Sequence, residues 1–241
     1  MLSANEIKKI RSLREKKYRD EYGLFVVEGE KLVDEALRSG WEVEGVWRIG
    51  EIGPATMSRI SSLSNPSPAL AVVRKRPDTL PGLPGKGLCL ALDGIRDPGN
   101  LGTILRAADW FGVDAVYASP DTVDLYNPKV VQATMGAIFR VEFHYTDLPD
   151  LCRRWTASGG VVYGTFLDGK NIYGEALETG SGAPVLVITG SEADGISPAV
   201  AECVSSRLYF PPFPPDDPGS ESLNAAVATA LVLAEFRRRS S

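Results

Sequence analysis

The sequence predicts an α/β protein built from a small N-terminal unit and a larger domain with a parallel sheet. Apolar segments that do not alternate with polar residues recur along the chain, with helical segments between most of them. Such segments are typical of a parallel sheet covered by helices on both faces. Residues 77–87 hold three Pro and three Gly in eleven positions, which is typical of a linker. We therefore expect domains at 1–76 and 88–241.

The N-terminal unit is expected to begin with a basic helix at 5–19. An apolar run at 24–29 predicts a strand, and the amphipathic segment after it predicts a helix that ends at Gly40. The remaining expected elements are a strand at 43–47, a helix at 54–63 and a strand at 70–75.

The larger domain repeats this alternation on a larger scale. Its expected strands lie at 88–93, 115–119, 141–145, 161–166, 185–190 and 207–210. In open parallel sheets, ligands bind where loops leave the carboxyl ends of the strands. The candidate functional loops are therefore 94–102, 190–197 and 211–224.

The composition is that of an ordinary globular protein, with 241 residues, of which 44% are hydrophobic and 24% charged. The longest apolar runs are far shorter than the roughly 20 residues that span a bilayer. Neither membrane insertion nor secretion is indicated, and a cytoplasmic location is expected. Cys89, Cys152 and Cys203 are odd in number and widely spaced, which favours buried thiols in a reducing compartment over disulfides.

A metal site is not expected from this sequence. His144 is the only histidine, has no cysteine pair near it, and is expected to be a strand residue. A site built on Glu192 and Asp194 would need further ligands, and the sequence nominates none.

The charge is unevenly distributed along the chain. A formal net charge of −5 argues against indiscriminate binding of nucleic acid. Residues 1–20 nevertheless carry seven positive and three negative side chains. Two interpretations stay open: this run is a solvated helix face, or it is a phosphate-binding footprint on an otherwise acidic protein.

The first candidate loop opens a helix with the sequence DPGNLGTILRAADWFG. Asn100 is a plausible helix N-cap, and Gly102 permits the close approach of another backbone. Arg106 lies on the second turn, either as a surface side chain over Trp110 or as a multi-donor contact for phosphate. The stretch lacks both G-x-G-x-x-G and a GK[ST] ending, so the fingerprint of a Rossmann-type dehydrogenase is missing.

The other two loops also place polar residues at element ends. In VLVITGSEADGIS a buried strand ends at Thr189, and Glu192 and Asp194 follow it between glycines. Carboxylates in such a place often do chemistry, but they can also simply brace a loop. In SESLNAAVATALVLAEF, Ser222 to Asn224 open a helix rich in Ala and Val, with Ser222 as a possible N-cap. The small residues of this helix predict very close packing.

Taken together, the three loops resemble, in order and spacing, the three motifs of the SpoU (TrmH-like) family of RNA ribose 2'-O-methyltransferases. NLGTILRAADWFG is similar to the first motif, VLVITGSEADGIS to the second and SLNAAVATALVLAEF to the third. Between them, KVVQATMGAIFRV resembles the family's small-Gly-Ala segment. Residues 8–37 resemble its substrate-binding domain, so the likeness covers nearly the whole chain.

The resemblance implies a catalytic domain with a parallel sheet and a deep trefoil knot, through which the last segment of the chain threads. It implies S-adenosylmethionine as the methyl donor, an RNA ribose 2'-hydroxyl as the acceptor, a homodimer, and no need for a metal. The N-terminal domain favours ribosomal RNA. The alternatives are a tRNA 2'-O-methyltransferase and a non-catalytic RNA-binding or assembly protein with the same fold.

The resemblance also implies roles for individual residues. Arg106 matches the catalytic arginine, with Asn100 nearby, Glu192 matches the second-motif glutamate, and Ser222 and Asn224 match the third-motif pair. Because the pKa of arginine lies above 12, Arg106 serves either as a perturbed base or as a group that holds phosphate and stabilises an alkoxide. The positions expected to bind the cofactor are Thr165, Gly190, Glu192, Phe210 and Leu223.

Three features depart from the family pattern. Ser191 stands where the family commonly has Asn, and Ala193 stands where it has Gly. The loop FPPFPPDDPGSE is long and rich in proline, so Phe213 is an alternative to Phe210 as the cofactor-binding residue.

For the homodimer, the expected contacts are the large residues Trp110 and Phe111 and a small apolar face made of Ala226, Ala230, Leu233 and Ala234.

Overall fold

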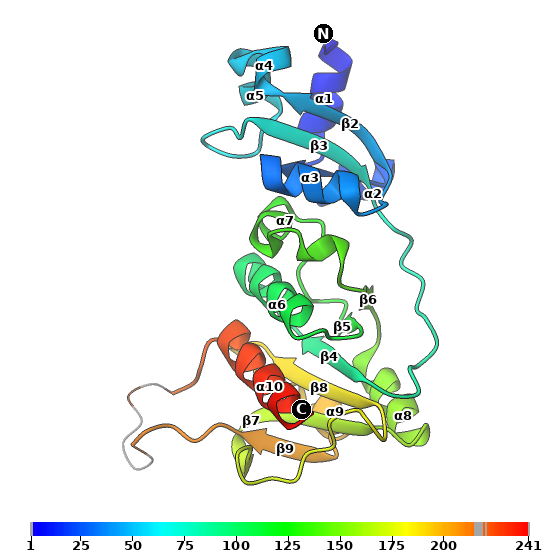
Figure 1. Cartoon of the computed structure of the whole chain (residues 1–241), viewed down its shortest axis with the longest axis vertical. Helices are drawn as coiled ribbons and strands as arrows, with labels where there is room; N and C mark the ends of the chain where they lie inside the picture. Colours follow the sequence, from blue (N-terminus) through cyan, green and yellow to red (C-terminus); the bar gives the residue numbers. More distant parts are fainter. Residues whose placement is uncertain (1, 215–218, 220, 241) are drawn as a thin grey trace. The chain divides into compact units, whose positions relative to one another are not determined.

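The computed structural model describes residues 2–214, 219 and 221–240. It divides into two compact units that interleave in sequence. The first comprises Met1–Pro77, Leu101–Arg106 and Asp124–Arg140, and the second comprises Asp78–Asn100, Ala107–Val123 and Val141–Ser241. Figure 1 shows the elements in chain order.

The first unit is built on a three-stranded antiparallel sheet with the order β1-β3-β2. The strands are β1 (Leu24–Glu28), β2 (Val43–Arg48) and β3 (Ala69–Arg74). The helices described in this unit are α1 (Ala4–Ser12), α2 (Lys16–Tyr22), α3 (Glu30–Arg38), α4 (Ile49–Ile52), α5 (Pro54–Ile60) and α7 (Pro128–Thr134), and a 3-10 turn η1 (Ala137–Phe139) follows α7.

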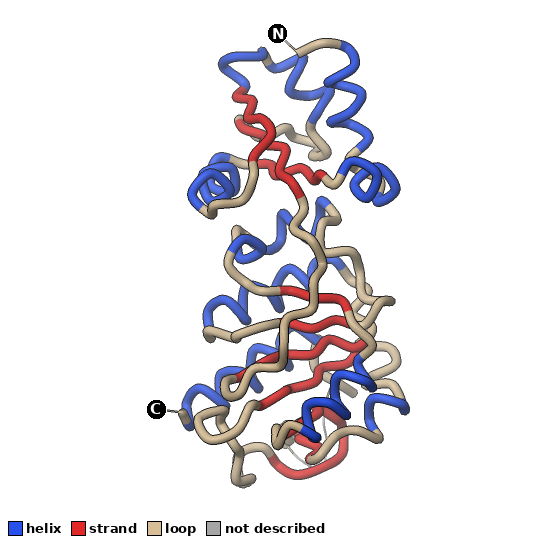
Figure 2. Tube along the Cα trace, turned by 90° about the vertical axis from the view of Figure 1, so that its right-hand side faces the viewer, coloured by secondary structure: helices blue, strands red, loops and turns tan. Residues whose placement is uncertain are grey.

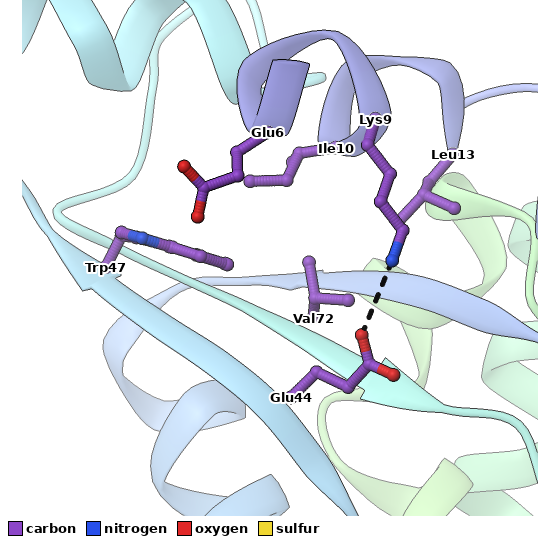
Figure 3. Close-up of a pocket in the computed structure, with 7 residues that line it drawn as sticks. All are labelled: Glu6, Lys9, Ile10, Leu13, Glu44, Trp47 and Val72. Carbon is purple, nitrogen blue, oxygen red and sulfur yellow. Dashed lines mark ion pairs between the residues drawn. The ribbon is translucent and has the colours of Figure 1, made fainter. Parts of the chain in front are cut away.

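One face of this sheet carries a hydrophobic core cluster. Ile7, Ile10 and Leu13 pack there with apolar side chains of all three strands and of α5. A groove of about 150 Å³ lies between α1 and the sheet (Figure 3). In the groove the ring of Trp47 covers Gly45, where a Cβ would lie 2.7 Å from the indole.

The helix expected at 5–19 is two helices, and this part of the prediction was wrong. A capping box between Ser3 and Glu6 starts α1, which ends at Ser12, and α2 begins at Lys16. The carbonyls of Leu13 and Arg14 accept hydrogen bonds from the Arg19 guanidinium at 2.9 and 2.7 Å. In a continuous helix these carbonyls would accept main-chain N–H groups four residues later, so a side-chain contact takes the place of the helical hydrogen bonds.

The second unit contains the predicted parallel sheet, with six strands in the order β6-β5-β4-β8-β7-β9. All neighbouring strands pair in parallel. The strands are β4 (Leu88–Asp93), β5 (Val116–Ala118), β6 (Phe143–Tyr145), β7 (Val161–Asn171), β8 (Val185–Gly190) and β9 (Ser206–Tyr209). His144 lies buried in β6, as expected.

Helices cover both faces of this sheet, and Figure 2 shows them on either side of the strands. On one face Trp155 of α8 (Leu148–Ala157) and Val200 of α9 (Pro198–Ala201) pack with alternate residues of β8 such as Leu186. On the other face α10 (Ala225–Arg239) crosses β8, and the hydroxyl of its Thr229 donates to the hydroxyl of Thr189 at 3.2 Å. Both hydroxyls are buried.

Two expectations about helix starts are corrected by the structure. The N-cap of α6 (Pro98–Trp110) is Asp97, whose carboxylate accepts from the backbone N–H of Asn100 at 2.8 Å. The N-cap of α10 is Asn224 and not Ser222. In both helices the true cap lies within three residues of the one that was expected to fill that place.

The apolar face expected to pair with a second copy is corrected in part. Ala226 is 3% exposed and Leu233 is fully buried inside the chain, because this side of α10 packs on the sheet, whereas Ala230 and Ala234 are half-buried. The apolar side chains that α10 exposes are Val227 and Leu231, at 49% and 40%.

Cys89 and Cys152 are buried free thiols, as expected, and Cys203 is a half-buried one. Burial raises the pKa of Cys89 and that of Cys152 to about 12. Among the described residues there is no helix that is both long enough and apolar enough to cross a membrane.

Candidate active site

Three of the predicted site residues, Asn100, Glu192 and Asn224, meet in one hydrogen-bonded cluster. The Oε1 atom of Glu192 accepts from the side-chain amide of Asn100, from Nδ2 of Asn224 at 3.0 Å, and from the backbone N–H of Ala225 at 3.2 Å. Nδ2 of Asn224 also donates to Oδ1 of Asn100 at 2.9 Å. The cluster therefore ties together the three loops that the sequence nominated.

Helix capping fixes the direction of Asn224 and leaves Asn100 available. Oδ1 of Asn224 accepts from the N–H groups of Ala226 and Val227 at 3.0 and 3.3 Å, so its Nδ2 is left to donate to the cluster. Asn100 does not cap α6, because Asp97 does. Its side chain is therefore free to reach Glu192.

The loop after β8 presents Glu192 on a tight fold of the backbone. A Cβ on Gly190 would lie 2.1 Å from the carbonyl carbon of Gly195, so only glycine permits the chain to return this closely. The N–H of Gly195 donates to the Ser191 carbonyl at 2.9 Å, and the N–H of Asp194 donates to the Ser191 hydroxyl at 3.0 Å. Ser191 thus helps to close the loop.

A neighbouring residue, Arg96, was missed by the sequence analysis. Its guanidinium pairs with Asp194 at 3.2 Å and with Asp121 at 3.4 Å, which links the loops that follow β4, β5 and β8. A hydrogen bond from the Ser119 hydroxyl holds the pKa of Asp121 below its ordinary value, and Arg96 adds to this effect. The only signal in the sequence that could have identified Arg96 was its position directly after a predicted strand.

The residues expected to bind the cofactor lie in or directly after three adjacent strands, and Thr165 follows the last residue of β7 that pairs with β8. Thr165 is in β7, Gly190 ends β8, and Phe210 follows β9. The Thr165 hydroxyl donates to the Ile188 carbonyl at 3.3 Å. Phe210 is half-buried with its ring edge-on to Tyr173, whereas Phe213 is 94% exposed.

Leu223, beside the cluster residue Asn224, is 46% exposed. The residues expected to bind the cofactor thus include two apolar side chains, Phe210 and Leu223, which suit the apolar face of a purine nucleoside. In the part of the chain that the structure describes, no group of three or more His, Cys, Asp or Glu side chains could hold a metal ion.

Arg106 and Ser222 are not part of the hydrogen-bonded cluster. Arg106 lies on α6 in the first unit, is exposed, and makes no hydrogen bond or ion pair with another described residue. Ser222 is exposed just before α10 and likewise has no side-chain partner among the described residues. A cationic side chain held by no partner is free to bind an anionic ligand.

Comparison with known proteins places this arrangement in a family. Residues 87–234 match the SpoU rRNA methylase family, and residues 4–65 match the MRM3-like substrate binding domain. The 23S rRNA (guanosine(2553)-2'-O)-methyltransferase RlmP of Bacillus subtilis is 31% identical over 96% of both chains.

Solved structures agree with these sequence matches. A TrmH-family protein from Porphyromonas gingivalis superimposes with a TM-score of 0.87 at 40% identity, covering 99% of both chains. An AdoMet-bound rRNA methyltransferase from Sinorhizobium meliloti gives a TM-score of 0.85 at 30% identity, covering 99% of this chain and 97% of that one. By its sheet, by its three motif loops and by these relatives, the chain belongs to the SpoU rRNA methylase family.

Proposed function

We propose that this protein transfers a methyl group from S-adenosylmethionine to a ribose 2'-hydroxyl of ribosomal RNA. The observation that carries the proposal is the cluster of Asn100, Glu192 and Asn224, which joins all three motif loops of a SpoU family member. A relative aligned over 96% of this chain is named as a 23S rRNA 2'-O-methyltransferase. A structural neighbour at 30% identity was solved with AdoMet bound.

The cofactor site is proposed at the carboxyl edge of β7, β8 and β9. Thr165, Gly190, Phe210 and Leu223 would hold S-adenosylmethionine, with Glu192 beside them. When S-adenosylmethionine is bound, it supplies a methyl group that is already activated, so that no metal is required.

We also propose that the catalytic domain contains the deep trefoil knot. The strand order β4-β8-β7-β9 and the buried inner side of α10 support a chain that returns tightly into the sheet domain.

Arg106 is proposed to act on the RNA. Arginine stays protonated near neutral pH, so its guanidinium is suited to donate and not to accept a proton. It would hold the phosphate next to the target ribose and stabilise the charge that develops as the 2'-hydroxyl loses its proton. Its exposure and its lack of a partner among the described residues support this role.

The cluster is proposed to position the loops around the reacting groups. Oε1 of Glu192 is occupied by three N–H donors, so its other oxygen is left to accept a hydrogen bond from a ligand. Ser222, next to this cluster in sequence, would offer its hydroxyl to the RNA. Fixed donors and acceptors of this kind hold reactants in line at low entropic cost.

Residues 1–76 are proposed as the RNA-binding domain, joined through the linker 77–87 to the methyltransferase domain 88–241. Several cations of the basic run have partners inside the protein: Lys9 with Glu44, Lys16 with Asp20, and Arg14 with the Ser61 carbonyl. Lys8 and Arg11 are exposed and have no such partner among the described residues. These two are the best candidates for phosphate contacts.

The protein is further proposed to act as a homodimer in the cytoplasm. In the second unit Trp110 is 85% exposed, and Val227 and Leu231 are exposed on one side of α10. Large apolar side chains exposed in this way commonly mark an interface.

The proposed function is tested with purified protein, labelled S-adenosylmethionine, and rRNA or tRNA as acceptor. We expect label in rRNA and, on mapping, one ribose that resists alkaline cleavage only in cells that carry the gene. Label in tRNA alone would show that the substrate is tRNA and not rRNA. A protein that binds RNA but not S-adenosylmethionine would be a binding or assembly protein, and the proposal would be wrong.

A further inference from the structure

An ion pair with little exposure to solvent lies within the first unit, between Arg19 and Asp124, whose side chain is 12% exposed. The side chain of Arg19 is 3% exposed, and its Nε and Nη2 donate to Oδ2 of Asp124 at 3.1 and 2.6 Å. The same guanidinium also donates to the carbonyls of Leu13 and Arg14. Asp124 lies 105 residues further along the chain, so the pair joins α2 to the segment 124–140.

Other contacts join the same two parts of the unit. Phe25 of β1 lies 4.8 Å from the ring of Tyr126, and Trp41 meets Phe139 edge to face at 5.4 Å. Glu35 of α3 also pairs with Arg140. The pair of Arg19 and Asp124 is therefore one member of a continuous contact between residues 13–41 and the segment 124–140.

The segment 124–140 also packs against the helix that carries Arg106. A Cβ on Gly102 would lie 2.3 Å from the Cβ of Ala133 and 3.0 Å from the Val130 carbonyl oxygen. The backbone of α6 therefore rests directly on α7. Arg106 follows Gly102 by about one helical turn, and residues 101–106 belong to the same compact unit.

We propose that Arg19 and Asp124 are positioning residues for Arg106. The pair fastens the residues that receive RNA to the segment 124–140, and this segment seats α6, so that RNA reaches Arg106 in a fixed register. The inference rests on the proposed function of Arg106.

The physical reason is the cost of breaking a buried pair. Removing one partner leaves an uncompensated charge in the interior, and this loss is far larger than that of an exposed ion pair. The contact between residues 13–41 and 124–140 would then loosen while Lys8 and Arg11 remain in place. RNA would still bind, but it would be misplaced relative to Arg106.

The test is Asp124→Asn, which keeps the shape of the side chain and removes its charge. We expect kcat for rRNA methylation to fall at least roughly tenfold, since small misplacements can cost about 10²-fold. The Kd values for RNA and for S-adenosylmethionine should stay unchanged. Amide hydrogen exchange should quicken at 101–106 and 128–134 and remain slow in β8 and α10.

The control is Arg48→Gln, which removes exposed ion pairs in the same unit, with Glu30 and Asp34, and should leave kcat unchanged. If Asp124→Asn is too unstable to assay, Arg19→Lys is measured by the same criteria, because it keeps the charge but loses the forked geometry. An unchanged kcat, or RNA affinity that falls as much as kcat, would overturn the inference. Should the wild-type protein fail to methylate RNA, the proposed function fails, and hydrogen exchange at 101–106 alone decides whether the pair holds α6.

Discussion

At the scale of single residues, the site depends on how each polar group is shared. Asn224 divides its side chain between two tasks, since Oδ1 caps α10 and Nδ2 binds Glu192 and Asn100. Such a division leaves no freedom to flip the amide, because the backbone N–H groups of the helix demand an acceptor. The helix start therefore orients the loop that carries Glu192.

Arg106→Ala should abolish turnover while leaving the fold intact. The side chain has no partner among the described residues, so its removal should not change Tm or the affinity for S-adenosylmethionine. The rate should fall by about 10²-fold or more, as is typical of groups that act in a transition state. Arg153→Ala, which removes another exposed arginine, is the matched control. A variant that keeps more than about a tenth of the wild-type rate would contradict the role.

The identities of these residues could be predicted from the sequence, but their hydrogen bonds could not. The motifs placed Asn100, Glu192 and Asn224 in three loops at one edge of the sheet, where the structure has them. The expected cap at Asn100 was wrong because the Asp-Pro pair just before it is the stronger signal for a helix start. Arg96 was missed because its two acidic partners come from other loops.

At the scale of elements, the central strands β4 and β8 followed directly from their continuous apolar runs, whereas the N-terminal helix did not follow from its periodicity. Local sequence between Leu13 and Glu15 contains no helix breaker, and at the interruption Arg19 donates to the carbonyls of Leu13 and Arg14. Its guanidinium is also paired with the distant Asp124, and a long-range contact of this kind can override local propensity without leaving a signal in the residue pattern. Close helix contact at Gly102 was predicted and is confirmed.

Gly102→Ala should separate α6 from α7. The added methyl would lie 2.3 Å from the Cβ of Ala133 and 2.9 Å from its carbonyl carbon, and backbone cannot move away as a side chain can. We expect a decrease of about 1–3 kcal/mol in the free energy of unfolding, measured by urea titration. Gly50→Ala adds a methyl where nothing lies within 4 Å and is the control. Equal stability of the two variants would show that the helices are less closely packed.

The last turn of α10 should contribute stability that depends on pH. Hydrogen bonds from Arg238 and Arg239 lower the pKa of Glu235 from 4.5 to about 2. Because the folded-state pKa is depressed, this contribution is complete above about pH 4.5 and is lost as the pH falls toward 2. Glu235→Gln should therefore lower Tm near neutral pH, and its difference from wild type should shrink across that window. Glu221→Gln, a substitution at an exposed position, is the matched control.

At the scale of the whole molecule, an acidic protein must bind RNA through a local cationic surface. The net charge is −5, so long-range attraction is weak and the cationic side chains that touch RNA must supply the affinity. Replacing both Lys8 and Arg11 with Gln should weaken RNA binding and lower the slope of log Kd against log salt by about 0.7–0.9 for each phosphate that is no longer neutralised. The same charge change at Arg153 and Lys170 is the control. If the two double variants behave alike, the basic run is only a solvated face.

Assembly into a dimer is the second property of the whole molecule. We expect it from the apolar side chains that are exposed on the second unit. Burial of Ala226 and Leu233 inside the chain leaves Val227, Leu231 and Trp110 as its exposed apolar side chains on α10 and at the end of α6. A stable two-fold interface built on them should bury at least roughly 1,000 Å² in total, and each of its contacts should occur twice. We expect sedimentation at about twice the 26.0 kDa chain mass.

The double variant Val227→Glu, Leu231→Glu places charges in that interface. It should therefore sediment with the mass of a single chain. Leu37→Glu, at a position 51% exposed on α3, should leave the dimer intact. Charged residues are readily accepted at exposed helix positions. The Tm of the double variant should therefore fall only as far as loss of the dimer lowers it, and the Tm of Leu37→Glu should not change. Wild-type protein that sediments as a monomer and still methylates RNA at full rate would show that the exposed face of α10 serves another purpose.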